Sequence, residues 1–403
     1  MPNDKFLVET VGANLVTIDQ ISEWERLRQQ NQSLRSPYFS QRFFWAVKDV
    51  IPNSYLAIIK SDNRVMGYFP FQIRGNTIQA LGSPLVDYQS IICDSDFCLD
   101  LKDLLEVVQK KRFEFNGWLG TGVGRKNHLV AHSYFADLND GFDCYMSERK
   151  SNSPSFFKSL KRRTRSLYQD FGSAECEVRK ATKDDVMSIL NQKQLQYLQK
   201  GTFDVFDCGW TVSMLLALTE ASDDDFGLFY AELCVGDKKI AGELFLREGD
   251  FAHSWFPVFN SKYSKYSPGH LLTLMLIEKL TSLGVKNFDF GVGHEKYKES
   301  LASRGNECLE GAYSANEPAA HAFFELVDKL APKIAKVMSR YRHSVYRRRR
   351  ILTACEPTLI GKVSAGIKMA KKFAARRFTN LLIFINCAYS EISTYTLYPL
   401  AIA

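Results

Sequence analysis

The sequence lacks the cysteine patterns that hold zinc or build a disulfide framework. It has nine cysteines, an odd number, with no CxxC pair and no neighbouring histidine. A zinc site and a disulfide framework are therefore not expected, and we predict no metal site. Cys93 and Cys98 are close enough in sequence to suggest a redox pair, but most of the thiols are expected to be small buried side chains.

Several catalytic signatures are missing too. The sequence has no GxSxG elbow, no HExxH pair and no Walker A loop. These absences argue against a serine hydrolase, a zinc protease and a P-loop nucleotide hydrolase. The N-terminal region lacks the basic start, apolar run and small-residue cleavage site of a secretory signal, so we expect a cytoplasmic protein.

Acidic residues are scarce in one region only. Residues 331–380 contain fourteen Lys or Arg and the single acid Glu356, although the net charge of the whole chain is only +7. Residues 1–330 are consequently net acidic. A basic segment of this kind can bind an anionic membrane surface or nucleic acid.

The final segment, residues 381–403, is apolar but is interrupted by Asn386, Glu391 and Pro399. A spanning helix needs about 20 residues with few polar interruptions, so we do not expect a transmembrane helix. Basic residues followed by an apolar segment favour peripheral contact with the inner face of a membrane. The alternative is a basic helical extension that packs on the enzyme or touches RNA.

Residues 251–297 carry the clearest local pattern. The aromatic-rich segment 251–259 is typical of a strand, and Ser267-Pro268-Gly269 forms a turn before an apolar run of helical spacing. That run stops at Gly284, and residues 287–290 form a second strand. Strand, turn, helix and strand make a β-α-β unit.

The turn that begins this helix is a candidate anion site. The free N–H groups of a first helical turn, together with the positive end of the helix dipole, suit a pyrophosphate. We therefore predict that a cofactor pyrophosphate binds here. The predicted binding residues are Tyr266, Ser267, Pro268, Gly269, His270, Leu271 and Leu272.

Six short segments resemble one family. YSPGHLL, FDFGVG and EKYK are similar to the C-terminal half of the GNAT-like acyltransferases linked to cellulose and exopolysaccharide synthesis; SPYFSQRFF, GYFPFQIRG and LGSPLVDYQS are similar to the N-terminal half. The family is related to the Fem aminoacyltransferases. Over residues 36–313 the resemblance implies an α+β, tandem GNAT-like fold with two mixed sheets flanked by helices, and acetyl-CoA or another acyl-CoA as co-substrate.

The remaining patterns fit such a division of the chain. We expect an N-terminal half (1–150), a C-terminal acyltransferase half (151–315) and a basic helical extension (316–403), with SERKSNSPS as the linker between the halves. The first half begins with a short strand at 15–18, and a helix follows Ser40. Its three-stranded meander is expected at 55–59, 64–73 and 77–81. The second half is expected at 156–171 (helix), 175–179 (strand), 184–200 and 211–221 (helices), and 227–235, 239–247 and 251–259 (strands).

Acyl transfer from a thioester needs a base for the acceptor proton, a donor for the developing oxyanion and a proton for the leaving thiolate. Asp289 ranks first as the base because it ends a strand at the cleft, beside Gly291 and Gly293, where substrate could approach the backbone. Glu243, on a central strand, ranks next. The full set of candidates is Asp289, Glu243, His253, His294, Tyr297 and Lys298.

We therefore expect an acyltransferase that moves an acyl group to an amine or hydroxyl of a sugar, polysaccharide precursor or small molecule by direct attack. The segment SPGHLL contains one glycine, and its proline removes an N–H donor, so the donor identity stays open. Two alternatives remain. One is a Fem-like transferase using aminoacyl-tRNA, which the net acidity of residues 1–330 disfavours; the other is a non-catalytic protein that binds membrane or nucleic acid through its basic tail.

Overall fold

The computed structural model of the protein describes residues 6–97, 99, 101–120, 129–200, 203–293, 295–314, 350–356, 358, 360–361 and 364–365. Cys98, His294, the predicted helix 319–339, the apolar segment 381–403 and most of 362–378 lie outside these residues. Within the described part of the chain, no helix has the length and apolar character needed to cross a bilayer.

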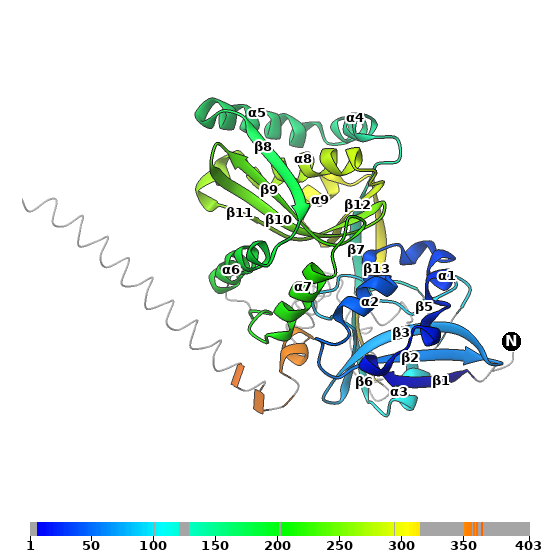
Figure 1. The fold of residues 1–403 in the computed structure, drawn as a ribbon. Coiled ribbons are helices and arrows are strands. Elements are labelled where there is room, and N and C mark those ends of the chain that lie inside the picture. The colour runs from blue at the N-terminus through cyan, green and yellow to red at the C-terminus, as the bar shows by residue number, and fades with distance from the viewer. Residues whose placement is uncertain are drawn as a thin grey trace, which may run out of the picture.

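The strands form one continuous sheet that runs through the whole molecule (Figure 1). Its order is β1-β2-β3-β4-β6-β13-β7-β12-β11-β10-β9-β8, and β5 pairs with β3 beside this path. The strands are β1 (Leu7–Gly12), β2 (Ser54–Ser61), β3 (Arg64–Arg74), β4 (Thr77–Ala80), β5 (Ile92–Cys93), β6 (Arg112–Trp118), β7 (Leu129–Asp137), β8 (Ala174–Lys180), β9 (Phe226–Val235), β10 (Lys238–Glu248), β11 (Phe251–Phe259), β12 (Asn287–Val292) and β13 (Arg304–Ser314).

Helices cover both faces of the sheet. In the C-terminal half, α4, α5 and α8 lie on one face, and α6 and α7 lie on the other (Figure 1). The helices are α1 (Trp24–Gln29), α2 (Gln41–Val47), α3 (Leu101–Val107), α4 (Phe142–Asn152), α5 (Pro154–Phe171), α6 (Lys183–Lys200), α7 (Trp210–Glu220), α8 (Pro268–Ser282) and α9 (Lys296–Leu301), with short 3₁₀ turns that include η1 (Ala13–Leu15), η4 (Pro37–Phe39) and η6 (Ser261–Tyr266).

The two halves repeat one order of elements and exchange their last strands. Each half runs strand, two helices, three strands, helix, strand and a final strand. The final strand of the first half, β7, pairs with β12 of the second, and the final strand of the second half, β13, pairs with β6 of the first. Since β7 and β13 also pair with each other, the exchange joins both halves into one sheet. The expected tandem GNAT-like fold is confirmed, but its strands form one mixed sheet and not the two sheets that were expected.

Most predicted elements are present, but one predicted strand is absent, the expected linker is helical, and the strands β1, β7 and β13 were not predicted. Residues 15–18 are not a strand: η1 ends there, and Leu15 and Ile18 are 69% and 74% exposed, so they face no sheet. The expected linker SERKSNSPS is helical, in α4 and the start of α5. Strand β7 was missed, although its alternating buried and exposed residues carry the period of two typical of a strand.

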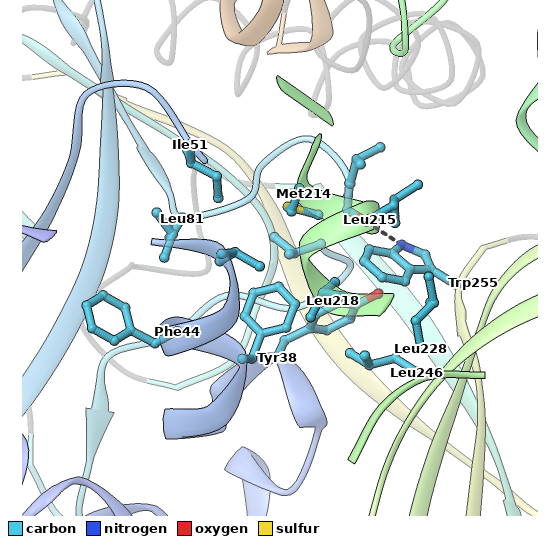
Figure 2. Packing of buried hydrophobic residues seen from close by; sticks show 14 of the residues in the cluster. Tyr38, Phe44, Ile51, Leu81, Met214, Leu215, Leu218, Leu228, Leu246 and Trp255 are labelled. Atoms are coloured by element: carbon cyan, nitrogen blue, oxygen red, sulfur yellow. Dashed lines mark hydrogen bonds between the residues drawn. The ribbon is translucent and has the colours of Figure 1, made fainter. Parts of the chain in front are cut away.

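One apolar core spans both halves. Figure 2 shows Tyr38 from η4 of the first half beside the α7 residues Met214, Leu215 and Leu218 of the second. Phe44 from α2 belongs to the same cluster. Leu228, Leu246 and Trp255 close the same cluster from the strands below. The burial of these apolar side chains stabilises the contact between α7 and the first half more than a few surface ion pairs would.

Residues 82–90 of the first half, which we call the 82–90 loop, reach into the second half. The loop runs beside the end of β6, where the amide of Gln89 donates to the carbonyl of Gly117 and the carbonyl of Gln89 accepts from Leu119. The indole of Trp255 donates to the carbonyl of Leu85 at 2.8 Å. Together these bonds hold the loop against the end of β6 and against β11.

Gly117 is required for this path. Its φ is +57°, and a Cβ there would lie 1.8 Å from the carbonyl oxygen of Asp87. Gly236, in the β9–β10 turn, has a similar φ of +54°, but a Cβ at that position would meet no other atom within 4 Å. An alanine at Gly236 would therefore test the cost of the backbone conformation alone, and an alanine at Gly117 would add the cost of a clash.

We predict that Gly236→Ala lowers the free energy of unfolding by about 1–2 kcal/mol, the cost of a left-handed alanine. Gly117→Ala should cost this amount and a further ~1–3 kcal/mol, because the 82–90 loop must move. Guanidinium denaturation of both variants measures the difference. Equal losses would mean that the loop does not press on Gly117.

Candidate functional site

Strands β11 and β12 separate at the centre of the second half. They pair in parallel over three positions only, ending at His253 and Asp289. Beyond that pair the chain of β11 continues through η6 to the start of α8, at the open end of the two strands. The gap between two parting strands beside a helix N-terminus is where an extended ligand can add its own polar groups to the sheet.

The start of α8 presents polar groups at this open end. Ser267 precedes the helix in a left-handed conformation, with φ of 56°, and Pro268 is the first helical residue. The N–H groups of Gly269 and His270 follow in the first turn, where no intrahelical acceptor exists. From α5, the guanidinium of Arg163 donates to the Ser267 hydroxyl. A cation and free amides therefore meet at one helix N-terminus, which suits a phosphate group.

The seven residues predicted around this turn do not all face it. Tyr266, Pro268, Leu271 and Leu272 are buried, so their side chains belong to the core rather than to a ligand surface. Ser267, Gly269 and His270 are only partly buried. Only three of the seven predicted residues are therefore accessible to a ligand at this turn.

Aromatic rings extend the surface from α8 toward α9. The His270 ring lies 5.1 Å from the Tyr297 ring and 5.4 Å from the Phe156 ring, between centroids. Burial, with a smaller contribution from Arg163, lowers the pKa of His270, so it is neutral at pH 7. His270 thus acts here as a flat, uncharged ring.

A histidine between two carboxyl groups occupies the point where the strands part. Nδ1 of His253 lies 2.9 Å from Oδ2 of Asp289, and Nε2 lies at an ion-pair distance of 3.3 Å from Oδ2 of Asp87 in the 82–90 loop. The His253 side chain is fully buried. Burial lowers the pKa of His253, but Asp289 and Asp87 outweigh it and raise that pKa to about 9. His253 is therefore protonated at neutral pH.

Asp289 has no free oxygen in this arrangement. Its Oδ1 accepts from the Tyr88 hydroxyl at 2.9 Å and from the Gly291 amide at 2.7 Å, and its Oδ2 faces His253. The residue is fully buried. Such a carboxylate orients its neighbours and has little room to accept a proton from a substrate.

The two glycines beside Asp289 make room for protein side chains. Gly291 has φ of +75°, and a Cβ there would lie 2.4 Å from Oδ2 of Asp87. A Cβ at Gly293 would lie 2.1 Å from Glu295 and 2.7 Å from Nζ of Lys298. The sequence suggested that these glycines admit substrate, whereas each lies against a neighbouring side chain.

Glu243 is the second acidic group of the site. It lies on β10, is 1% exposed, and accepts a hydrogen bond from the hydroxyl of Ser254 on β11. Burial raises the pKa of Glu243 to about 7, against smaller opposing effects of the Ser254 hydrogen bond and of Lys193, His253 and Lys298. A carboxyl group with this pKa can take up and release protons at neutral pH.

Tyr297 and Lys298 approach from α9. Burial, followed by the charges of Glu243 and Glu295, raises the pKa of Tyr297, so its hydroxyl keeps its proton. The ammonium of Lys298 is largely buried and lies 3.3 Å both from the Val292 carbonyl and from the Glu295 carboxylate. Lys298 therefore cross-links the turn between β12 and α9.

The first half has a counterpart of this pair of parting strands, with a glutamine where the second half has His253. Strands β4 and β6 also pair in parallel over three positions, and the last pair is Gln79 with Glu114, where β11 and β12 have His253 with Asp289. Gln79 donates to Glu114 at 3.2 Å and to the carbonyl of Arg350 at 3.3 Å. A glutamine cannot titrate, so of the two related positions the second half carries the candidate active site.

A large open hollow lies elsewhere on the second half. Its volume is about 900 Å³, between β8, β9 and the C-terminal part of α8. Glu175, Glu177, Glu232 and Glu278 line it with the single cation Lys279. The negative end of a helix dipole and four carboxylates repel phosphate, so this hollow does not suit an anionic ligand.

Sequence reasoning missed the contributions of the first half and of α5. Tyr38, whose ring lies 4.9 Å from that of His253, comes from SPYFSQRFF, and Asp87 and Tyr88 come from LGSPLVDYQS. Both segments had been noted only as similarities. Arg163 is one of several Lys and Arg residues on α5, and no local sequence signal distinguishes it from the others.

Among the described residues, no group of three His, Cys, Asp or Glu side chains is placed to hold a metal ion.

The second half is similar in sequence to a known protein family. Residues 154–299, a little over a third of the chain, match a family model described as an acetyltransferase (GNAT) domain. The sequence matches no curated protein at a significant level.

Solved structures with a similar course of the chain include FemX, with 11% identity, a TM-score of 0.45, and coverage of 79% of this chain and 100% of that one. A tandem GNAT protein of the clavulanic acid pathway has 9% identity, a TM-score of 0.45, and coverage of 77% and 98%. The C-terminal domain of a putative lysylphosphatidylglycerol synthetase from Agrobacterium fabrum has 10% identity, a TM-score of 0.41, and coverage of 77% of this chain and 96% of that one. At these TM-scores the similarities add no argument; the GNAT-type fold of the second half follows from the family match and from the order of its elements.

The histidine cluster predicts a pH dependence of stability. Because His253 has a raised pKa in the folded state, its stabilising contribution is complete below its ordinary pKa of about 6.5 and is lost as pH rises through about 9. Asp87→Asn removes one carboxylate and should lower the His253 pKa and shrink this loss. Denaturation at pH 6.5 and 9.5 measures the loss of unfolding free energy between these pH values. Asp96→Asn, at an exposed position, is the control. An unchanged loss in Asp87→Asn would show that Asp87 does not hold the proton on His253.

Proposed function

We propose that this protein transfers an acyl group from acyl-CoA to an amine or hydroxyl acceptor at the gap between β11 and β12. The observation that carries the proposal is the meeting of three features: strands that part after His253 and Asp289, a helix start with free amides, and Arg163 beside it. The family match over residues 154–299 supports the same class of reaction.

For the donor, we propose that the amides of Gly269 and His270 and the guanidinium of Arg163 bind the pyrophosphate. The residues fit such a group because the site is cationic and a ligand can approach the backbone at Gly269, which carries no side chain. The acyl and pantetheine parts would then extend between the parted strands toward Glu243 and Tyr297.

For the chemistry, we propose Glu243 as the general base. With a pKa of about 7 and a hydrogen bond from Ser254, it can receive the acceptor proton through that hydroxyl as the acceptor attacks the thioester directly. Asp289 then positions His253 rather than acting as the base, because its oxygens already accept from three donors. This reverses the ranking made from the sequence.

For the leaving group, we propose that Tyr297 supplies the proton that neutralises the departing thiolate. Its hydroxyl keeps its proton at neutral pH, and its ring packs on His270 at the start of α8.

For the acceptor, the resemblance to exopolysaccharide-linked acyltransferases favours a sugar or polysaccharide precursor. A cytoplasmic location, with peripheral membrane contact through the basic residues of 331–380, is part of the same proposal.

The reaction can be tested by incubating the protein with acetyl-CoA and a panel of amino sugars and measuring the release of the free CoA thiol. Transfer from aminoacyl-tRNA but not from acyl-CoA would replace it with the Fem-like alternative.

We predict that Gly269→Val weakens CoA binding about tenfold or more, or roughly 1.4 kcal/mol. A Cβ at this position meets only Phe259, at an ordinary 3.7 Å, so the added side chain should obstruct the ligand rather than the fold. Isothermal titration calorimetry with CoA measures the dissociation constant. An unchanged constant in a folded variant would remove the α8 turn from the binding site.

Arg163→Gln should also weaken CoA binding about tenfold, since a hydrogen bond to a charged group contributes about 1.5–3 kcal/mol. Arg162→Gln is the matched control, because Arg162 is exposed on the same helix and makes no ion pair among the described residues. Titrations at low and high salt separate the specific contact from general charge attraction. Similar losses in both variants would rule out a specific role for Arg163.

Glu243→Gln should lower turnover about 10²- to 10⁴-fold and leave the CoA dissociation constant unchanged, because a base acts on the acceptor proton. In the wild type, kcat/KM should rise as pH passes through about 7, where Glu243 loses its proton. The variant should lack this rise. Near-normal turnover with the same pH profile would show that the base is another group.

A further inference from the structure

Two cysteines that are far apart in sequence meet at the base of α7. Sγ of Cys208, in the turn before α7, lies 3.0 Å from Sγ of Cys355, in the helical segment 350–355. Both residues are partly exposed. Segment 350–355 is the orange piece beside α7 in Figure 1.

The surroundings of the two sulfurs are polar on one side. The Cys208 thiol lies 3.1 Å from the Val205 carbonyl and 3.6 Å from the Thr211 hydroxyl. Cys355 lies 3.8 Å from the same carbonyl. Both thiols therefore share one polar neighbour at the edge of the apolar core, against which both cysteines also pack.

A buried arginine adds positive charge to this site. Arg74 is 4% exposed, stacks on the Trp210 ring at 4.9 Å, and interacts electrostatically with both thiols. One of its nitrogens donates to the Pro52 carbonyl at 2.7 Å, while Nε and Nη2 have no hydrogen-bond partner among the described residues. A buried guanidinium with two unused donors favours a thiolate beside it.

We propose that Cys208 and Cys355 form a reversible disulfide that joins segment 350–355 to α7, with Cys208 as the thiol that reacts first. This modification site is independent of the acyl-transfer proposal. A disulfide bond is about 2.03–2.05 Å long, so each sulfur has to move only about half an ångström.

The order of attack follows from the environment of each thiol. A hydrogen bond from the Cys355 thiol lowers the pKa of Cys208, and burial opposes this less strongly. The same hydrogen bond raises the pKa of Cys355, and burial raises it further. The thiolate is the nucleophile in disulfide exchange, so Cys208 attacks first.

A small disulfide such as glutathione disulfide is the oxidant. The Cys208 thiolate attacks one glutathione sulfur, and the other glutathione leaves as a thiolate that takes the proton released by Cys208. Cys355 then attacks the Cys208 sulfur; the bond to glutathione breaks, and the second glutathione leaves with the Cys355 proton. Two protein thiols are oxidised, and one glutathione disulfide is reduced to two thiols.

The bond would close a loop between positions 208 and 355, which are separated by 147 residues. Cross-links that close long loops restrict the unfolded chain most. Segment 350–355 also contacts the first half, where the carbonyl of Arg350 accepts from Gln79. The guanidinium of Arg350 lies 3.3 Å from Glu310 of β13 in the second half. The disulfide would therefore anchor segment 350–355, which precedes the basic residues between positions 362 and 377 in the sequence.

The full-length protein can be incubated with glutathione buffers of increasing oxidised fraction, quenched by alkylation, and mapped by mass spectrometry. The wild type should yield a linked Cys208–Cys355 peptide that dithiothreitol removes. Cys355→Ser should instead accumulate glutathione on Cys208, and Cys208→Ser should lose the link. Cys144→Ser, which removes an exposed thiol elsewhere, should keep it.

Arg74→Gln gives a second readout that does not require the disulfide to form. If the variant stays folded by circular dichroism, alkylation of Cys208 at pH 7 should slow several-fold relative to alkylation of Cys144. Two results would overturn the proposal. One is a wild type that carries glutathione on Cys208 but never forms the link, and the other is oxidation of Cys144 at the same ratio without a Cys208–Cys355 bond.

Discussion

The separation of β11 and β12 after His253 and Asp289 is the constraint on which the second half depends. The two strands pair at three positions, and beyond these positions their backbone N–H and C=O groups no longer bond to each other. The gap gives an extended ligand access to the sheet and places the start of α8 at its mouth. His253, Asp289 and Glu243 lie buried in the strands on either side of this gap.

The first half completes that specification. Tyr38 and the 82–90 loop bring a ring, a hydroxyl and a carboxylate to His253 and Asp289, and the exchanged strands β7 and β13 fix both halves in one sheet. The first half has kept the same strand geometry with Gln79 in place of the histidine. One half thus supports the other rather than providing a second site of the same kind.

The sequence was sufficient for what depends on local patterns. The β-α-β unit, the β2–β4 meander, the helix after Ser40 and the helix expected at 156–171 follow from periodicity, caps and turns over a few residues. It was insufficient where chemistry depends on distant partners. Tyr88 and Asp289 are 201 positions apart, and Cys208 and Cys355 are 147 apart, so no spacing rule could pair them. The preference for Asp289 over Glu243 failed to anticipate three donors that only the folded chain brings to Asp289.

A crystal structure of the protein with CoA would test the proposed binding site most directly. We expect the pyrophosphate against the amides of Gly269 and His270, with Arg163 on one side and the thiol end between β11 and β12 near Glu243 and Tyr297. CoA bound in the related cleft of the first half beside Gln79, or in the acidic hollow between β8 and α8, would contradict this assignment.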